Sequence, residues 1–265
     1  MGNAFDHLLL QQQRTWNRTA MQVAVILVII AVCSFYVGLF DMKRLSEGIP
    51  SLFSMLGEML PPNFSDAQDW IKPLVDTFAM SVAGTALAVA FSLPLALLAA
   101  PNTSPHPIVY QMARGILNGL RAIPELIMGI IFVAAVGFGA LPGVLALGLH
   151  SIGMVGKFFA EAIEHADNNP VEAARAAGAT SLQVIMHGIL PQVLPQMADV
   201  SIYRWEYNFR ASTVMGMVGA GGIGFELMGS LRIMQYQDVF AILLVILVMV
   251  TMVDSLSGYL RKRFK

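Results

Sequence analysis

The feature that most constrains this chain is an uninterrupted apolar run from Met21 to Phe40 that contains no charged side chain. A helix of this length crosses a bilayer core of about 30 Å. Arg14 and Arg18 precede the run, as basic residues precede the core of a signal peptide. That core is only about 7–15 residues long, and no small-x-small cleavage site follows Phe40. The run therefore predicts a first membrane span that is retained in the protein.

Composition agrees with a membrane protein. Hydrophobic residues make up 56% of the chain and charged residues only 12%, whereas soluble domains carry about 25% charged residues. The net charge of -1 gives no basic surface for a nucleic-acid partner. Cys33 is the sole cysteine, so internal disulfides and cysteine-based metal sites are excluded. Most of the surface of the folded protein is therefore expected to be surrounded by membrane lipid.

Further apolar stretches follow along the chain and are separated by proline, glycine and charged residues. Open strands cannot exist in the bilayer core, so each stretch is expected to be a helix. The sequence predicts an all-α membrane protein with a single transmembrane domain over residues 1–265 and about six spans. Their expected ranges are 21–40, 74–100, 123–141, 144–159, 193–214 and 239–256.

Basic residues predict the orientation, because Lys and Arg accumulate in cytoplasmic loops. With the N-terminus inside, the expected inner segments are rich in these residues, and the outer segment 41–73 carries more acidic than basic ones. We therefore expect both termini and the polar segment 161–192 to be cytoplasmic. The inner basic residues are Arg14, Arg18, Arg114, Arg121, Lys157, Arg175, Arg261, Lys262, Arg263 and Lys265.

The polar segment 161–192 begins with a strong helix signal. Asn169 is a suitable N-cap, Pro170 follows it, and Glu172 completes a pattern similar to a capping box. An alanine-rich stretch then favours a helix. Gly178 supplies the left-handed residue that ends one. These residues predict a short helix closed by a glycine turn.

A second helix is predicted directly after that turn. Thr180 and Gln183 repeat the capping-box spacing, and Pro191 and Pro195 are expected to break the helix. The segment is therefore either an ordinary polar loop or a docking surface, because alanine and glycine permit close approach by another protein. The residues alone leave these two interpretations open.

The segment Glu172-Ala173-Ala174, followed by Gly178 and by Leu190-Pro191, resembles the EAA loop of ABC-importer permeases. The family pattern has an isoleucine two residues before Leu-Pro, where this chain has Gly188. The resemblance implies that 161–192 is a coupling loop that fits a groove of a cytoplasmic ABC ATPase dimer. The coupling residues that it implies are Glu172, Ala173, Ala174, Gly178, Leu190 and Pro191.

The stretches 121–125 and 203–224 resemble the permeases of phosphonate and phosphite ABC importers. The resemblance implies a bacterial inner-membrane subunit that acts with a periplasmic substrate-binding protein and a second permease copy. It also implies that this chain holds no cofactor, since ATP and Mg would be bound by the ATPase. The related oxyanions phosphonate, phosphite and hypophosphite stay open as substrates.

Charges in the fifth predicted span are candidate pathway residues, because charges at membrane depth are costly. Glu206 and Arg210 are spaced i,i+4 and are expected to neutralise each other as a structural pair. Alternatively, Arg204 or Arg210 makes the pathway electropositive, since a guanidinium binds phosphonate-like oxygens bidentately. The full set of candidates is Arg204, Glu206, Arg210, Ser212, Thr213, Gly219, Gly221 and Gly222.

Other functions are less well supported by the sequence. Gly219, Gly221 and Gly224 match a dinucleotide fingerprint, but that site needs a preceding strand; a glycine-rich turn at the outer face is preferred. The histidines are dispersed without metal-ligand spacing, no catalytic set is visible, and no phosphate-binding lysine motif is present. The remaining rivals are a permease of a related ABC importer for another small solute, an ATPase-independent channel or carrier and, more remotely, an intramembrane enzyme.

Overall fold

The computed structural model describes residues 2–263, with side chains from Gln12 onward except Arg14. The side chain of Arg14 and residue Lys265, both used above to predict orientation, therefore lie outside the described part. Within it every regular element is a helix, so the all-α prediction is confirmed. The α-helices are α1 (Gly2–Tyr36), α2 (Met42–Glu58), α3 (Ile71–Ala99), α4 (Pro107–Ala122), α5 (Glu125–Val136), α6 (Ala140–Glu164), α7 (Asn168–Ala176), α8 (Ser181–Val184), α9 (Leu190–Met215), α10 (Ile223–Arg232) and α11 (Tyr236–Lys262).

The residues up to Gly57 form one compact unit, and those from Glu58 onward form a second. In the first unit, α1 contains the apolar stretch Thr15–Tyr36, which is long enough to cross a membrane. Its other helix, α2, places apolar side chains at helical spacing along one side, with Leu45, Ile49 and Leu52 among them. The segment 41–73, which was predicted to lie outside, thus contains an amphipathic helix, a structure that covers a membrane or protein surface.

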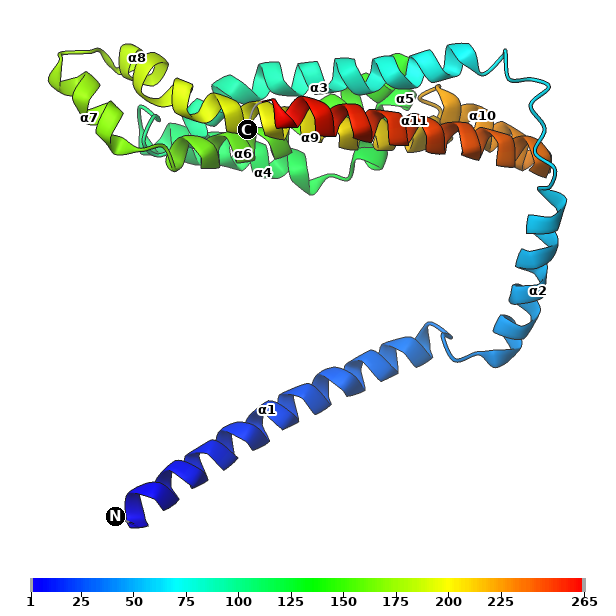
Figure 1. Cartoon of the computed structure of the whole chain (residues 1–265), viewed down its shortest axis with the longest axis horizontal. Helices are drawn as coiled ribbons and strands as arrows, with labels where there is room; N and C mark the ends of the chain where they lie inside the picture. The colour runs from blue at the N-terminus through cyan, green and yellow to red at the C-terminus, as the bar shows by residue number, and fades with distance from the viewer. Residues whose placement is uncertain (1, 264–265) are drawn as a thin grey trace. The chain divides into compact units, whose positions relative to one another are not determined.

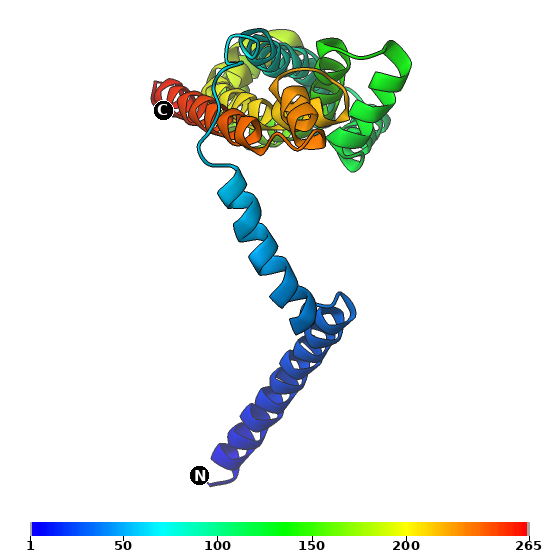
Figure 2. The same ribbon diagram turned by 90° about the vertical axis from the view of Figure 1, so that its right-hand side faces the viewer.

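The second unit is a helical bundle in which α3, α9 and α11 run lengthwise, and Figure 2 views it turned by 90°. Helix α6 packs against α3, α4, α5 and α9. Small residues let α3 and α6 approach closely, since a Cβ added at Gly84 would lie 3.1 Å from that of Leu147. By length and composition the described residues hold 4 candidate spans, or up to 6 if each bent helix pair is one span.

The predicted third span, 123–141, is wrong as a single helix. Helices α4 and α5 meet there at a bend of 85°. Pro124 disfavours a helical conformation in the residue before it, and Ile123 is extended (φ -92°, ψ 119°). Helix α5 ends at Val136 because Gly137 has a positive φ of 90°. The last two residues of the predicted span belong to α6.

The segment 161–192 folds into α7, α8 and a π-helical turn from Ile185 to Ile189. Helices α7 and α8 lie at one end of the bundle and α10 lies at the other (Figure 1). The predicted capping box of the second helix is confirmed, because the Thr180 amide donates to Gln183 Oε1 at 2.8 Å. The predicted cap at Asn169 is wrong: Asp167 caps α7 by accepting from the Asn169 amide at 3.0 Å.

The expectation that prolines end the second helix is also wrong. The π-helical turn leads directly into α9, which runs through Pro195 to Met215. Pro191 lies in the first turn of α9, a position in which proline is tolerated. Pro195 removes one further backbone bond without ending the helix, although proline is unfavourable there. The chain therefore passes from the polar end into the bundle without a loop.

Candidate functional site

The turn at Gly178 presents a surface of small residues at the end of the bundle. Gly178 has a φ of +80°, and its amide donates to Arg175 O at 3.0 Å. Val171 and Val184 are buried on the inner side of the segment, whereas Glu172, Ala173 and Gly178 are exposed. The predicted left-handed turn is thus confirmed; of the predicted coupling residues before it, Glu172 and Ala173 are exposed and Ala174 is half-buried against the core. Of the later coupling residues, Leu190 is half-buried and Pro191 is exposed.

This segment is attached to the bundle by a reciprocal pair of hydrogen bonds. The Asp167 amide donates to Gln192 Oε1 at 2.9 Å, and Gln192 Nε2 donates to Asp167 O at 3.2 Å. Gly188 is buried where the π-helical turn meets α7, and a Cβ there would lie 3.4 Å from Val171 Cα. A Cβ at this position, where the family pattern has isoleucine, would therefore touch the backbone of α7 at an ordinary van der Waals distance. These hydrogen bonds connect the start of α7 to the start of α9.

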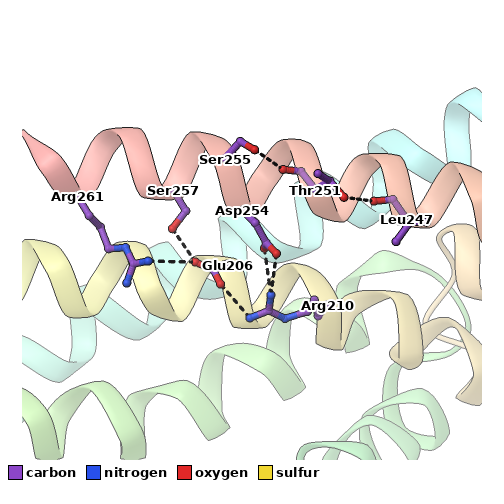
Figure 3. Close-up of polar contacts among 8 residues, drawn as sticks. All are labelled: Glu206, Arg210, Leu247, Thr251, Asp254, Ser255, Ser257 and Arg261. Carbon is purple, nitrogen blue, oxygen red and sulfur yellow. Dashed lines mark hydrogen bonds and ion pairs between the residues drawn. The ribbon is translucent and has the colours of Figure 1, made fainter.

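The predicted pair of Glu206 and Arg210 is confirmed, with an Nη2–Oε1 distance of 3.0 Å. It belongs to a larger network between α9 and α11 (Figure 3). Arg210 Nη1 donates to both carboxylate oxygens of Asp254, at 3.0 and 3.2 Å. Glu206 accepts from Ser257 Oγ at 2.8 Å and lies 3.8 Å from Arg261. We call these five residues the α9–α11 network; two carboxylates in it neutralise Arg210.

The wider network changes what a charge exchange between positions 206 and 210 should do. In an isolated pair, E206R together with R210E would restore the attraction. Here the carboxylate introduced by R210E would face Asp254, and the guanidinium introduced by E206R would face Arg261. We therefore expect the double exchange to assemble no better than either single variant, measured as yield of monodisperse protein. Adding D254R and R261E to the exchange reverses every charge of the network and should recover assembly; recovery by the double exchange alone would contradict the network.

Arg204 lies elsewhere on α9, in a second polar cluster. Its side chain is buried at 5% exposure, and Nε donates to Ser151 Oγ on α6 at 2.7 Å. The guanidinium carbon lies 4.2 Å from the centre of the Tyr207 ring, a distance suited to a cation–π contact. Nη2 is buried and has no hydrogen-bond partner among the described residues. The Arg204 guanidinium is thus fixed by Ser151 and Tyr207, while one of its donors, Nη2, has no hydrogen-bond partner among the described residues.

Hydrogen bonds extend this cluster on both sides of Arg204. On one side, Ser151 Oγ donates to Asn208 Oδ1 at 3.0 Å, and Asn208 Nδ2 donates to Thr85 Oγ1 at 2.9 Å. On the other, Tyr207 donates to Glu125 at 2.7 Å, and Glu125 lies 3.4 Å from His150 Nε2. We call these seven residues the Arg204 cluster. Of these residues only Arg204 was among the predicted pathway candidates, because four of the others lie on α3, α5 and α6, and helical spacing along α9 does not reveal them.

The remaining candidates lie at the far end of α9. Ser212 Oγ donates to the carbonyl of Phe209 at 2.7 Å, and Thr213 Oγ1 donates to that of Arg210 at 2.7 Å. Both hydroxyls are thus used by the backbone.

The glycine-rich turn connects α9 to α10. Its residues Gly219, Gly221 and Gly222 have φ angles of 98°, 73° and 74°, which favour glycine. A 3-10 turn, Gly216–Val218, precedes it at the end of α9. A dinucleotide site needs a strand in that place, so the glycine fingerprint is not one.

Comparison of this sequence with known proteins identifies the family to which the chain belongs. Residues 92–265 match the family described as binding-protein-dependent transport system inner membrane component. The chain belongs to this family. It is 68% identical over 260 residues to the phosphite transport system permease protein PtxC of Stutzerimonas stutzeri, covering 98% of this chain and 94% of that protein. The predicted resemblance to phosphonate and phosphite permeases is therefore confirmed, and the protein is an inner-membrane permease of an ABC importer.

Two further comparisons support this assignment. The permease is 43% identical over 223 residues to the phosphate-import permease protein PhnE of Mycolicibacterium smegmatis, covering 84% of this chain and 42% of that longer protein. Its fold matches that of a chain of the inward-facing MetNI methionine ABC transporter with a TM-score of 0.64, covering 74% of this chain and 96% of that one. Identity there is 20%, so this likeness concerns the fold alone.

Proposed function

We propose that this permease forms the membrane pathway for a tetrahedral phosphorus oxyanion, such as phosphite or a phosphonate. The observation that carries the substrate class is the 68% identity to a phosphite permease across nearly the whole chain. Membership of the family implies an ATPase and a substrate-binding partner. In our proposal the ATPase is a cytoplasmic dimer that holds ATP and Mg, the binding protein is periplasmic, and a second copy of this chain completes the pathway.

The segment 161–192 is proposed as the coupling element, on the cytoplasmic side together with both termini. Closure of the ATPases would press on the exposed surface around Gly178. The hydrogen-bonded link between Asp167 and Gln192 would pass this movement to α9. Because α9 carries both Arg204 and Arg210, the movement would reach the charged residues of the pathway.

Reconstitution separates this proposal from a channel or carrier. The permease is placed in liposomes with its ATPase and binding protein, and uptake of labelled phosphite is followed with and without internal ATP. We expect phosphite uptake to require ATP and both partners. Excess methylphosphonate or hypophosphite should reduce this uptake if it shares the pathway. Phosphite uptake by the permease alone would establish the channel or carrier, and absence of any phosphorus oxyanion uptake by the complete system would refute the proposed substrate.

A further inference from the structure

We infer that the guanidinium of Arg204 is the group that binds the transported oxyanion inside the membrane. This inference rests on the proposed function and adds the site at which the anion is held. The relevant ligand class is a tetrahedral oxyanion that presents at least two acceptor oxygens. Ser151 and Tyr207 act as positioning residues, because they hold the guanidinium without using all of its donors.

The hydrogen bonding of Arg204 is directional and incomplete. Nε is bound to Ser151 Oγ at 2.7 Å, and the hydroxyl of Ser151 is fixed in turn by Asn208. This arrangement holds one edge of the guanidinium and leaves Nη2 buried without a partner among the described residues. Leaving a buried donor unsatisfied costs roughly 1–3 kcal/mol, and more for a charged group. An oxyanion at Nη2 would remove this cost by a charge-assisted hydrogen bond.

Charge balance also distinguishes Arg204 from its neighbour on the same helix. Arg210 contacts carboxylate oxygens of both Glu206 and Asp254, so an anion would have to displace one of them. Among the described residues, no carboxylate lies within ion-pair distance of Arg204; the cluster's carboxylate, Glu125, is bound by Tyr207 instead. Of these two arginines, Arg204 is therefore the one that has no direct carboxylate partner among the described residues.

Adjacent space and polarity suit transient binding. Thr85 belongs both to the Arg204 cluster and to the lining of a groove of about 510 Å³ between α3 and Trp205. Apart from Thr85 and Trp205, the lining of this groove is apolar, so the anion would reach Arg204 past the Thr85 hydroxyl. Contact of the guanidinium with the Tyr207 ring and the nearby Glu125 weakens its pull on an anion. Such weakening suits a pathway, because an anion that is bound too tightly is not released.

The test compares R204K and R204Q with wild type in proteoliposomes that contain the ATPase and the binding protein. Phosphite uptake and ATP hydrolysis are measured in the same vesicles. R204K keeps the charge but loses the planar fork, and R204Q loses both. We expect phosphite imported per ATP to fall by about tenfold in R204K and further in R204Q, while ATP hydrolysis stimulated by the binding protein stays within about twofold of wild type.

The matched control is R121K, because Arg121 is a half-buried arginine on α4 that lies outside the Arg204 cluster. It should import phosphite at the wild-type ratio. If R204Q does not assemble, R204K alone decides the question. A wild-type ratio in R204K, or equal loss of uptake and ATP hydrolysis in both variants, would overturn the inference by assigning Arg204 no role or a purely structural one. Absence of phosphite uptake by wild type would instead refute the proposed function.

Discussion

Replacement of Gly178 by leucine is expected to abolish phosphite uptake while the permease still inserts and assembles. Gly178 has a φ of +80°, and this conformation costs an L-residue roughly 1–2 kcal/mol. No atom lies within 4 Å of the position that a Cβ would take, so the defect would come from the backbone. The turn between α7 and α8 would change shape, and the surface proposed to meet the ATPase would be lost. ATP hydrolysis should then continue without transport.

The matched control for this turn is G178N. Asparagine tolerates the left-handed conformation better than other side chains, and the open space around Gly178 accepts it. We expect G178N to keep most of the uptake per ATP, measured in the same proteoliposomes as G178L. Wild-type coupling in G178L would contradict the assignment of this turn, whereas equal failure of both variants would show that side-chain volume matters rather than φ.

Substitution of Gly224 by alanine is expected to prevent stable folding. A Cβ at this position would lie 1.7 Å from the carbonyl oxygen of Thr213 and 3.3 Å from Gly216 Cα. Both contacts are with backbone, so no side-chain rotation can relieve them. The cost should exceed the roughly 1–3 kcal/mol typical of overpacking. We expect little monodisperse protein or a melting temperature lower by about 10 °C or more.

Gly229 provides the control on the same helix, α10. A Cβ there meets no atom within 4 Å, and alanine is favoured over glycine in a helix by roughly 0.5–1 kcal/mol. G229A should therefore match wild type or melt slightly higher, as followed by size-exclusion chromatography of heated, detergent-solubilised protein. Equal melting temperatures for G224A and G229A would show that α10 does not pack on α9 as closely as the structure has it.

Local features were sufficient for much of the fold. The apolar runs predicted helices, because the bilayer core leaves few alternatives to them. Gly178, and Thr180 with Gln183, marked a turn and a cap through conformational preferences that act over a few residues. The pair of Glu206 and Arg210 followed from helical spacing alone. Local signals were less reliable at Asn169, because Asp167 two residues earlier is an equally good cap. They also failed at Pro191 and Pro195, because α9 continues through both.

The amino-acid sequence by itself thus determined a helical membrane protein, its polar end and its resemblance to phosphorus-oxyanion permeases. Only the tertiary structure decided which arginine is neutralised and which is not. Asp254 reaches Arg210 from α11, and Ser151 reaches Arg204 from α6. Local periodicity shows which residues share a face of one helix, but the rotation and register of that helix against its neighbours depend on packing of the whole bundle. The partners of each arginine were therefore decided by contacts between helices.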